Sequence, residues 1–125
     1  MSNDRYRRLL ADVKTHITEI TLDDYLRTAA ATTDAKPLLI DIREADEWAA
    51  GHAPEAIHIS RGVLEGSIEE EIPDVTTPIV LSCAGGNRSA LSAENLQRMG
   101  YTRVSSLIGG FGAWQKAGQP VVKSD

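Results

Sequence analysis

Short apolar runs alternate with helical patterns along this chain of 125 residues. The runs at 38–40 and 78–81 are apolar at every position, which is typical of strands buried on both faces of a sheet. Briefer strands are expected at 17–20 and 56–59, and a last one at 103–107. Because helical patterns separate these strands, the sequence predicts a doubly wound α/β domain with a parallel sheet between two layers of helices.

Apolar residues at helical spacing predict the helices. Four of them between Tyr6 and Val13 share one face, so the first dozen residues form an amphipathic helix that packs on its own domain or mediates self-association. Gly51 and Gly100 stand where glycine commonly ends a helix, and a loop is expected at 32–37. The remaining helices are expected at 22–30, 44–50, 63–72, 89–99 and around Trp114.

Length and charge limit the organisation and the partners. We expect an N-terminal helix at 1–16 and one further domain at 17–125, since the chain is long enough for a single core. A net charge of −5 favours neither nucleic acid nor an anionic membrane as partner. A lone cysteine forms no intramolecular disulfide, and charges interrupt the stretch 9–20, so nothing resembles an export signal. We therefore expect a cytoplasmic protein.

The stretch LSCAGGNRSA contains that cysteine, Cys83, at the end of a predicted strand and before a helix that starts near Ser89. Loops at the carboxyl ends of parallel strands are where sites form in such sheets. Gly85 and Gly86 can adopt positive φ, which curls successive amides toward one point, and Arg88 adds a positive charge. These groups and the helix dipole should lower the pKa of the thiol and make it a nucleophile; the alternative is an inert, buried cysteine.

The spacing around Cys83 narrows the chemistry. Four residues separate it from Arg88, whereas cysteine-dependent phosphatases have one more in this gap. The tighter loop suits a sulfur atom carried on the cysteine better than a tetrahedral phosphate, so a phosphatase or arsenate reductase is disfavoured. A nucleotide site is excluded too, because Gln115 stands where a dinucleotide fingerprint starting at Gly110 needs its third glycine.

Three segments in order resemble the rhodanese family of sulfurtransferases in its small single-domain form: 41–58, 83–88 and 108–114. The likeness extends from about residue 19 to 118. It implies a five-stranded parallel sheet flanked by helices, with Cys83 as the catalytic sulfur acceptor. The residues that would surround the bound sulfur are Ala84, Gly85, Gly86, Asn87, Arg88 and Ser89.

The resemblance also implies the reaction. A small anionic donor such as thiosulfate would pass its outer sulfur to Cys83, and cyanide or a thiol would remove it from the resulting persulfide. No cofactor is needed beyond this covalent intermediate. An alternative is a low-turnover module that carries sulfur to a protein partner or senses its redox state.

Four further residues bear on the site. Many thiosulfate-using members have a basic residue where this chain has Ala84, and Arg61, after the 56–59 strand, is a candidate substitute. Asp41 and Arg43 are expected to support the site, as a structural ion pair or by capping a loop near it, rather than to react.

Other residues that suggest a site have simpler interpretations. The three histidines, His16, His52 and His58, lack the spacing of metal ligands, so no metal is expected, and His52 is expected to hold a turn. The aromatic residues Trp48, Phe111 and Trp114 are expected to pack in the core.

Overall fold

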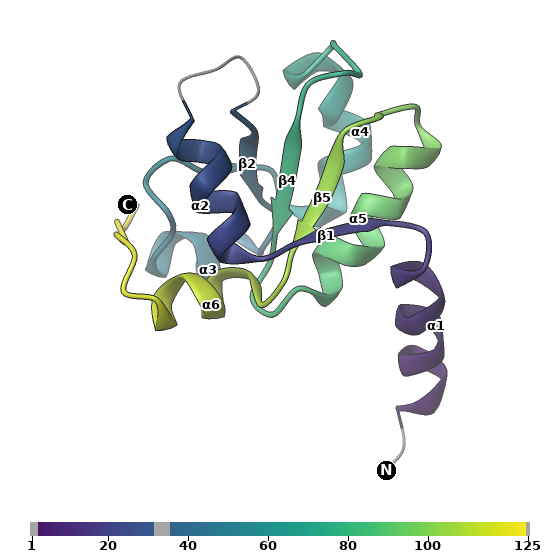
Figure 1. The fold of residues 1–125 in the computed structure, drawn as a ribbon, viewed down its shortest axis with the longest axis horizontal. Coiled ribbons are helices and arrows are strands. Elements are labelled where there is room, and N and C mark those ends of the chain that lie inside the picture. The colour runs from purple at the N-terminus through teal and green to yellow at the C-terminus, as the bar shows by residue number, and fades with distance from the viewer. Residues whose placement is uncertain (1–2, 32–35, 125) are drawn as a thin grey trace.

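The five strands form a single, wholly parallel sheet in the order β1-β5-β4-β2-β3 (Figure 1). The structure is a computed structural model and describes residues 3–31 and 36–124, so the loop expected at 32–37 lies mostly outside the described residues. The strands are β1 (Thr18–Ile20), β2 (Leu38–Asp41), β3 (Ile57–His58), β4 (Ile79–Ser82) and β5 (Val104–Leu107). The helices are α1 (Asp4–Lys14), α2 (Leu22–Ala30), α3 (Ala45–Ala50), α4 (Arg61–Glu71), α5 (Asn87–Arg98) and α6 (Gly110–Lys116).

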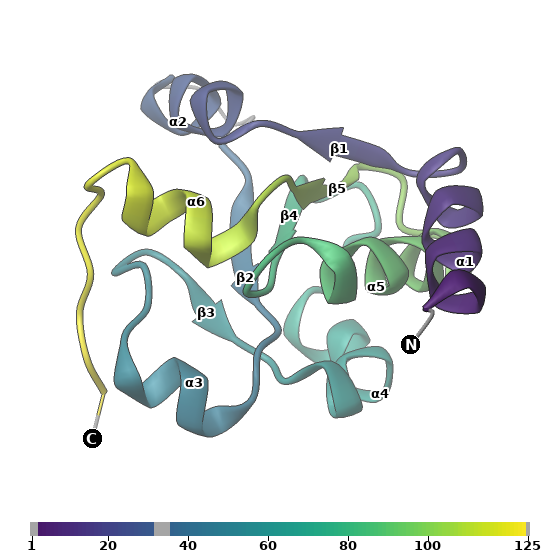
Figure 2. The same cartoon turned by 90° about the horizontal axis from the view of Figure 1, so that it is seen from below.

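The predicted α/β architecture is confirmed, with helices on both faces of the sheet (Figure 2). Successive side chains of a strand point to opposite faces. Accordingly Ile40 of β2 packs on one face of the sheet with α4 and α5, whereas its neighbour Leu39 packs on the other face with α2 and α6. The apolar runs read from the sequence are apolar throughout because each strand has two faces to bury.

Helix α1 lies against α5 at one end of the fold (Figure 2). Leu10 and Val13 are buried there, whereas Tyr6 and Leu9 are 41% and 49% exposed. Two of the four residues of the predicted apolar stripe thus pack on the same chain, and the other two stay exposed. Among the described residues no helix is long and apolar enough to cross a bilayer.

Two predicted helix starts are wrong by two residues. Helix α5 begins at Asn87 rather than Ser89, because Gly86 already supplies the cap with a φ of 104°. Helix α4 begins at Arg61 rather than Val63. Gly100 has the expected positive φ after α5, but Gly51 follows α3 in extended backbone, at a φ of 161°, and is no left-handed cap.

Strand β4 lies in the middle of the sheet, between β2 and β5, and all four of its residues are buried. The residue that leaves its carboxyl end is Cys83. The carboxyl end of a central strand, before a helix N-terminus, is the usual place for a site in a parallel sheet.

Candidate active site

The sulfur of Cys83 lies within a turn of hydrogen-bond donors. The positive φ of Gly86, which glycine adopts without strain, turns the loop back over the sulfur before α5 begins. The backbone N–H groups of Gly86 and Ser89 lie 3.0 Å and 3.4 Å from Sγ. Gly85 does not share the positive φ expected of it. One left-handed glycine is therefore enough to form this turn.

These donors favour the thiolate form of Cys83. Burial acts to raise its pKa, because a buried anion loses its water. Hydrogen bonds from the Ser89 hydroxyl and from the backbone of Ser89, Gly86 and Gly85 outweigh burial, so the pKa of Cys83 lies below the ordinary value of a thiol. A lowered pKa makes a cysteine nucleophilic near neutral pH, whereas apolar burial alone makes it inert.

The hydroxyl of Ser89 connects Cys83 to a residue that the sequence did not single out. It lies 3.5 Å from Sγ, 3.2 Å from the carbonyl oxygen of Gly86 and 2.7 Å from the hydroxyl of Ser106. Ser106 lies on β5 and is fully buried. A serine hydroxyl has one hydrogen, so a bond donated by Ser106 leaves the Ser89 hydrogen to be shared between the Gly86 carbonyl oxygen and the sulfur. No local pattern marks Ser106, because only the packing of α5 on β5 brings the two serines together.

Replacing Ser106 with alanine should raise the pKa of Cys83, since it removes the buried hydrogen bond, worth about 0.5–1.5 kcal/mol, that orients the Ser89 hydroxyl. The measurement is the rate of Cys83 alkylation by iodoacetamide as a function of pH. Ser105→Ala is the matched control, because Ser105 is the next residue of β5 and faces the opposite side of the sheet. Identical alkylation profiles for the two variants would show that Ser106 does not position Ser89.

The first turn of α6 fixes the backbone of the cysteine loop. The N–H groups of Phe111 and Gly112 donate to the carbonyl oxygens of Cys83 and Ala84, at 2.8 Å and 3.0 Å. Gly110 has a φ of 50°, and a Cβ there would stand 2.2 Å from the Cys83 carbonyl oxygen. The glycines of the 108–114 segment therefore let α6 approach the cysteine loop. The N–H groups of α6 then hold the loop's carbonyl oxygens on the side away from the sulfur.

Arg88 is paired with Glu47 of α3. Its two terminal nitrogens lie 2.9 Å and 3.1 Å from the two carboxylate oxygens. This hydrogen bonding, chiefly, lowers the pKa of Glu47 to about 2. The guanidinium also interacts electrostatically with Cys83, and the pKa of Arg88 is raised, first by the Glu47 bond. The predicted cation at the rim is thus present, but its charge is balanced by a carboxylate.

Asp41 and Arg43 form the expected structural ion pair at the end of β2. Both are buried, and Nη2 of Arg43 lies 2.8 Å from the Asp41 carboxylate and from the carbonyl oxygen of Gly51. The guanidinium also stacks on Phe111, 4.2 Å from the ring centre. One buried arginine therefore ties β2, the end of α3 and α6 together beside the cysteine loop.

The remaining predicted positions are more exposed. Ala84, Gly85 and Asn87 lie on the outside of the loop. Arg61 is the first residue of α4, and its N–H donates to the carbonyl oxygen of Ile42. Within residues 3–31 and 36–124, no hydrogen bond or ion pair joins its side chain to the cysteine loop. Its role in donor binding stays a prediction.

The histidines and aromatic residues have mostly the structural roles expected of them. His52 holds a turn through a 2.9 Å contact with the Ala53 carbonyl oxygen and stacks on Trp48, with ring centres 3.4 Å apart. Phe111 and Trp114 are buried in the core, but Trp48 is only half-buried, so that prediction is wrong. No group of potential metal ligands occurs among the described residues.

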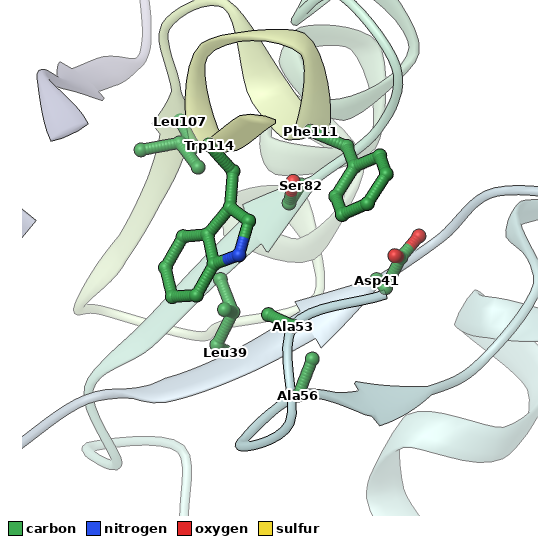
Figure 3. A pocket seen from close by; sticks show the side chains of 8 residues that line it. All are labelled: Leu39, Asp41, Ala53, Ala56, Ser82, Leu107, Phe111 and Trp114. Atoms are coloured by element: carbon green, nitrogen blue, oxygen red, sulfur yellow. The ribbon is translucent and has the colours of Figure 1, made fainter. Parts of the chain in front are cut away.

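Two hollows lie near the loop. An open cleft of about 400 Å³ is lined by Arg43, Glu47 and Ala84, together with Gly112 and Gln115 on the α6 side. The pocket in Figure 3 is smaller; from α6, Trp114 extends toward Leu39 and Phe111 lies on the side of Asp41. Its volume of about 10 Å³ holds at most one water molecule, so the open cleft is the one with room for a substrate.

Solved structures of similar fold cover nearly the whole chain. A Rhodopseudomonas palustris protein described as a possible tyrosine phosphatase is 31% identical, with a TM-score of 0.79 over 94% of this chain and 93% of that one. The polysulfide-sulfur transferase homodimer of Wolinella succinogenes is 25% identical, with a TM-score of 0.80 over 98% of this chain and 90% of that one.

A thiosulfate sulfurtransferase from Pseudomonas aeruginosa is 24% identical, with a TM-score of 0.79 over 94% of this chain, and shares the fold. This chain spans only 22% of that longer protein. The profile of the rhodanese-like domain matches residues 23–117, which include α3 to α6, β2 to β5, all of α2 except its first residue and the whole cysteine loop. With three ordered motifs, a parallel five-stranded sheet and a cysteine at the end of its central strand, this chain belongs to the rhodanese-like domain family.

Proposed function

We propose that this domain is a sulfurtransferase that carries sulfane sulfur on Cys83 as a persulfide. The observation that supports this most is the position of the chain's only cysteine. Its sulfur accepts hydrogen bonds from the backbone N–H groups of Gly86 and Ser89, with N to S distances of 3.0 Å and 3.4 Å. The names of two similar structures, a polysulfide-sulfur transferase and a thiosulfate sulfurtransferase, agree with the proposal.

In the first half-reaction the Cys83 thiolate attacks the outer sulfur of the donor. A new S–S bond forms, and the bond inside the donor breaks with its electron pair on the leaving group, which is sulfite when thiosulfate is the donor. The thiolate needs no separate general base, because its pKa is already lowered by the loop donors.

In the second half-reaction cyanide or a thiolate attacks the outer sulfur of the persulfide. The S–S bond breaks with its electron pair on Cys83, which returns as the thiolate. The same N–H groups that hold the thiolate stabilise the charge that redevelops on this sulfur. The cycle is therefore ping-pong and leaves the protein unchanged.

Intact-protein mass spectrometry tests the proposal with thiosulfate, mercaptopyruvate and glutathione persulfide as separate donors. We expect the gain of one sulfur atom that dithiothreitol removes, and catalytic thiocyanate formation when cyanide is added. Cys83→Ser should take up no sulfur. Full turnover by Cys83→Ser, or no uptake by the unaltered protein from any of the three donors, would refute the proposal.

A phosphatase is the rival that the Rhodopseudomonas palustris protein's name suggests. Cysteine-dependent phosphatases need the arginine of their loop to hold the phosphate. Here both terminal nitrogens of Arg88 are bonded to Glu47, and the loop is one residue shorter. We expect no hydrolysis of an aryl phosphate above the rate of Cys83→Ser.

A sulfur-carrier module of low turnover is the second alternative, favoured by the exposed, uncharged Ala84 on the loop. Such a module would also gain one sulfur, but cyanide would remove it no faster than it removes sulfur from a free persulfide. The rate of thiocyanate formation by preloaded protein separates the two functions.

A further inference from the structure

Arg88 is the cation of the cysteine loop, and Glu47 holds it in a two-point ion pair. The pair is about one-third exposed, with side-chain values of 29% for Arg88 and 32% for Glu47. The Glu47 carboxylate also accepts the N–H of Glu44 at 3.0 Å, so helix α3 holds it in place. A fixed carboxylate therefore balances the positive charge of the cysteine loop.

The cation that lines the neighbouring cleft is balanced as well. Arg43 lines it, but its Nε and Nη2 are bonded to the buried Asp41. Ala84 contributes a methyl group where the loop meets the cleft. Among the described residues that line this cleft, no cation is left without a carboxylate partner. A dianion entering it would give up water without gaining an unpaired positive charge, and would approach a thiolate in a protein of net charge −5.

Resting on the proposed function, we propose that Glu47 determines donor specificity: by neutralising Arg88 it disfavours dianionic donors such as thiosulfate and favours organic persulfides. The cleft of about 400 Å³ is within the range of sites that bind small organic molecules, so it has room for the organic part. The Cys83 thiolate attacks the terminal sulfur of R–S–SH, and the S–S bond of the donor breaks with its electron pair on R–S⁻. Cys83–S–SH forms with the donor's hydrogen still on the outer sulfur, and no further reactant is consumed.

Glu47→Gln tests this directly. Glutamine keeps an oxygen that can accept the Glu44 N–H but no longer neutralises Arg88. Sulfur loading of Cys83 is timed with two probes, thiosulfate and the persulfide of N-acetylcysteine methyl ester, whose organic part is uncharged. We expect kcat/KM for thiosulfate to rise about tenfold relative to the organic persulfide, and this gain to shrink as salt is added. Any change in the Cys83 pKa acts on both donors and cancels in their ratio.

Two further variants make the result decisive. Asp46→Asn removes a negative charge from the same helix without touching Arg88 and should leave the donor ratio unchanged. Glu47→Gln combined with Arg88→Gln should lose the gain. An unchanged ratio in Glu47→Gln, an equal shift in Asp46→Asn, or a gain that persists without Arg88 would overturn the specificity role while leaving the sulfurtransferase intact. Failure of the unaltered protein to load from either probe would instead count against the proposed function itself.

Discussion

Replacing Gly110 with alanine will remove sulfur loading and lower the free energy of unfolding by about 3 kcal/mol or more. The added Cβ would stand 2.2 Å from the carbonyl oxygen of Cys83, 2.9 Å from its carbonyl carbon and 3.0 Å from that of Ala84. All three atoms are backbone, so no side chain can rotate away. The φ of 50° adds the cost of a left-handed alanine. To relieve the clash, α6 must withdraw from the loop and break the bonds from Phe111 and Gly112.

Thermal unfolding and mass spectrometry measure the two effects of Gly110→Ala. A loss of about 3 kcal/mol corresponds to a fall in Tm of roughly 10 °C for a domain of this size. Gly66→Ala is the control, because Gly66 lies within α4 with nothing within 4 Å of an added Cβ, and alanine favours helix by up to about 1 kcal/mol. Unaltered Tm and loading in Gly110→Ala would contradict the role assigned to this glycine.

Asp41→Asn is expected to destabilise the protein by about 3–5 kcal/mol, since it leaves the buried Arg43 guanidinium without its counter-charge. The arginine would then turn toward water and release the carbonyl oxygen of Gly51 and the ring of Phe111. Because Phe111 donates to the Cys83 carbonyl oxygen, sulfur loading should slow in the folded fraction as well.

Urea unfolding followed by tryptophan fluorescence measures this loss. Asp24→Asn is the matched control, because Asp24 pairs with Arg27 on the surface of α2, where an ion pair contributes about 0–1 kcal/mol. Combining Asp41→Asn with Arg43→Met removes the unpaired charge and should restore part of the stability. A midpoint for Asp41→Asn equal to that of Asp24→Asn would show that the buried pair does not hold the fold.

Much of the fold could be predicted because its signals are local. Apolar runs and helical spacing identified each strand and helix, and Gly86, Cys83 and Arg88 lie close together in the chain as well as in space. The errors also have local causes. The start of α5 depends on which of two adjacent glycines, Gly85 or Gly86, takes the positive φ. Both can adopt it, so the sequence does not choose between them. Trp48 was expected in the core, but it is half-buried and stacks on His52.

The sequence by itself determined a parallel α/β domain of the rhodanese type, with a single cysteine at the end of a buried strand; that this strand is the central one came from the sheet order. Only the tertiary structure decided how that cysteine is held and which charges it meets. Glu47 lies 41 residues from Arg88, and Ser106 lies 17 from Ser89, so no periodicity or motif pairs them. Gly110 was recognisable as part of a motif. The reason that a glycine is needed there is the close approach of α6 to the Cys83 carbonyl oxygen. Local patterns specify backbone conformation, whereas contacts between distant segments depend on how the finished sheet brings helices to one edge.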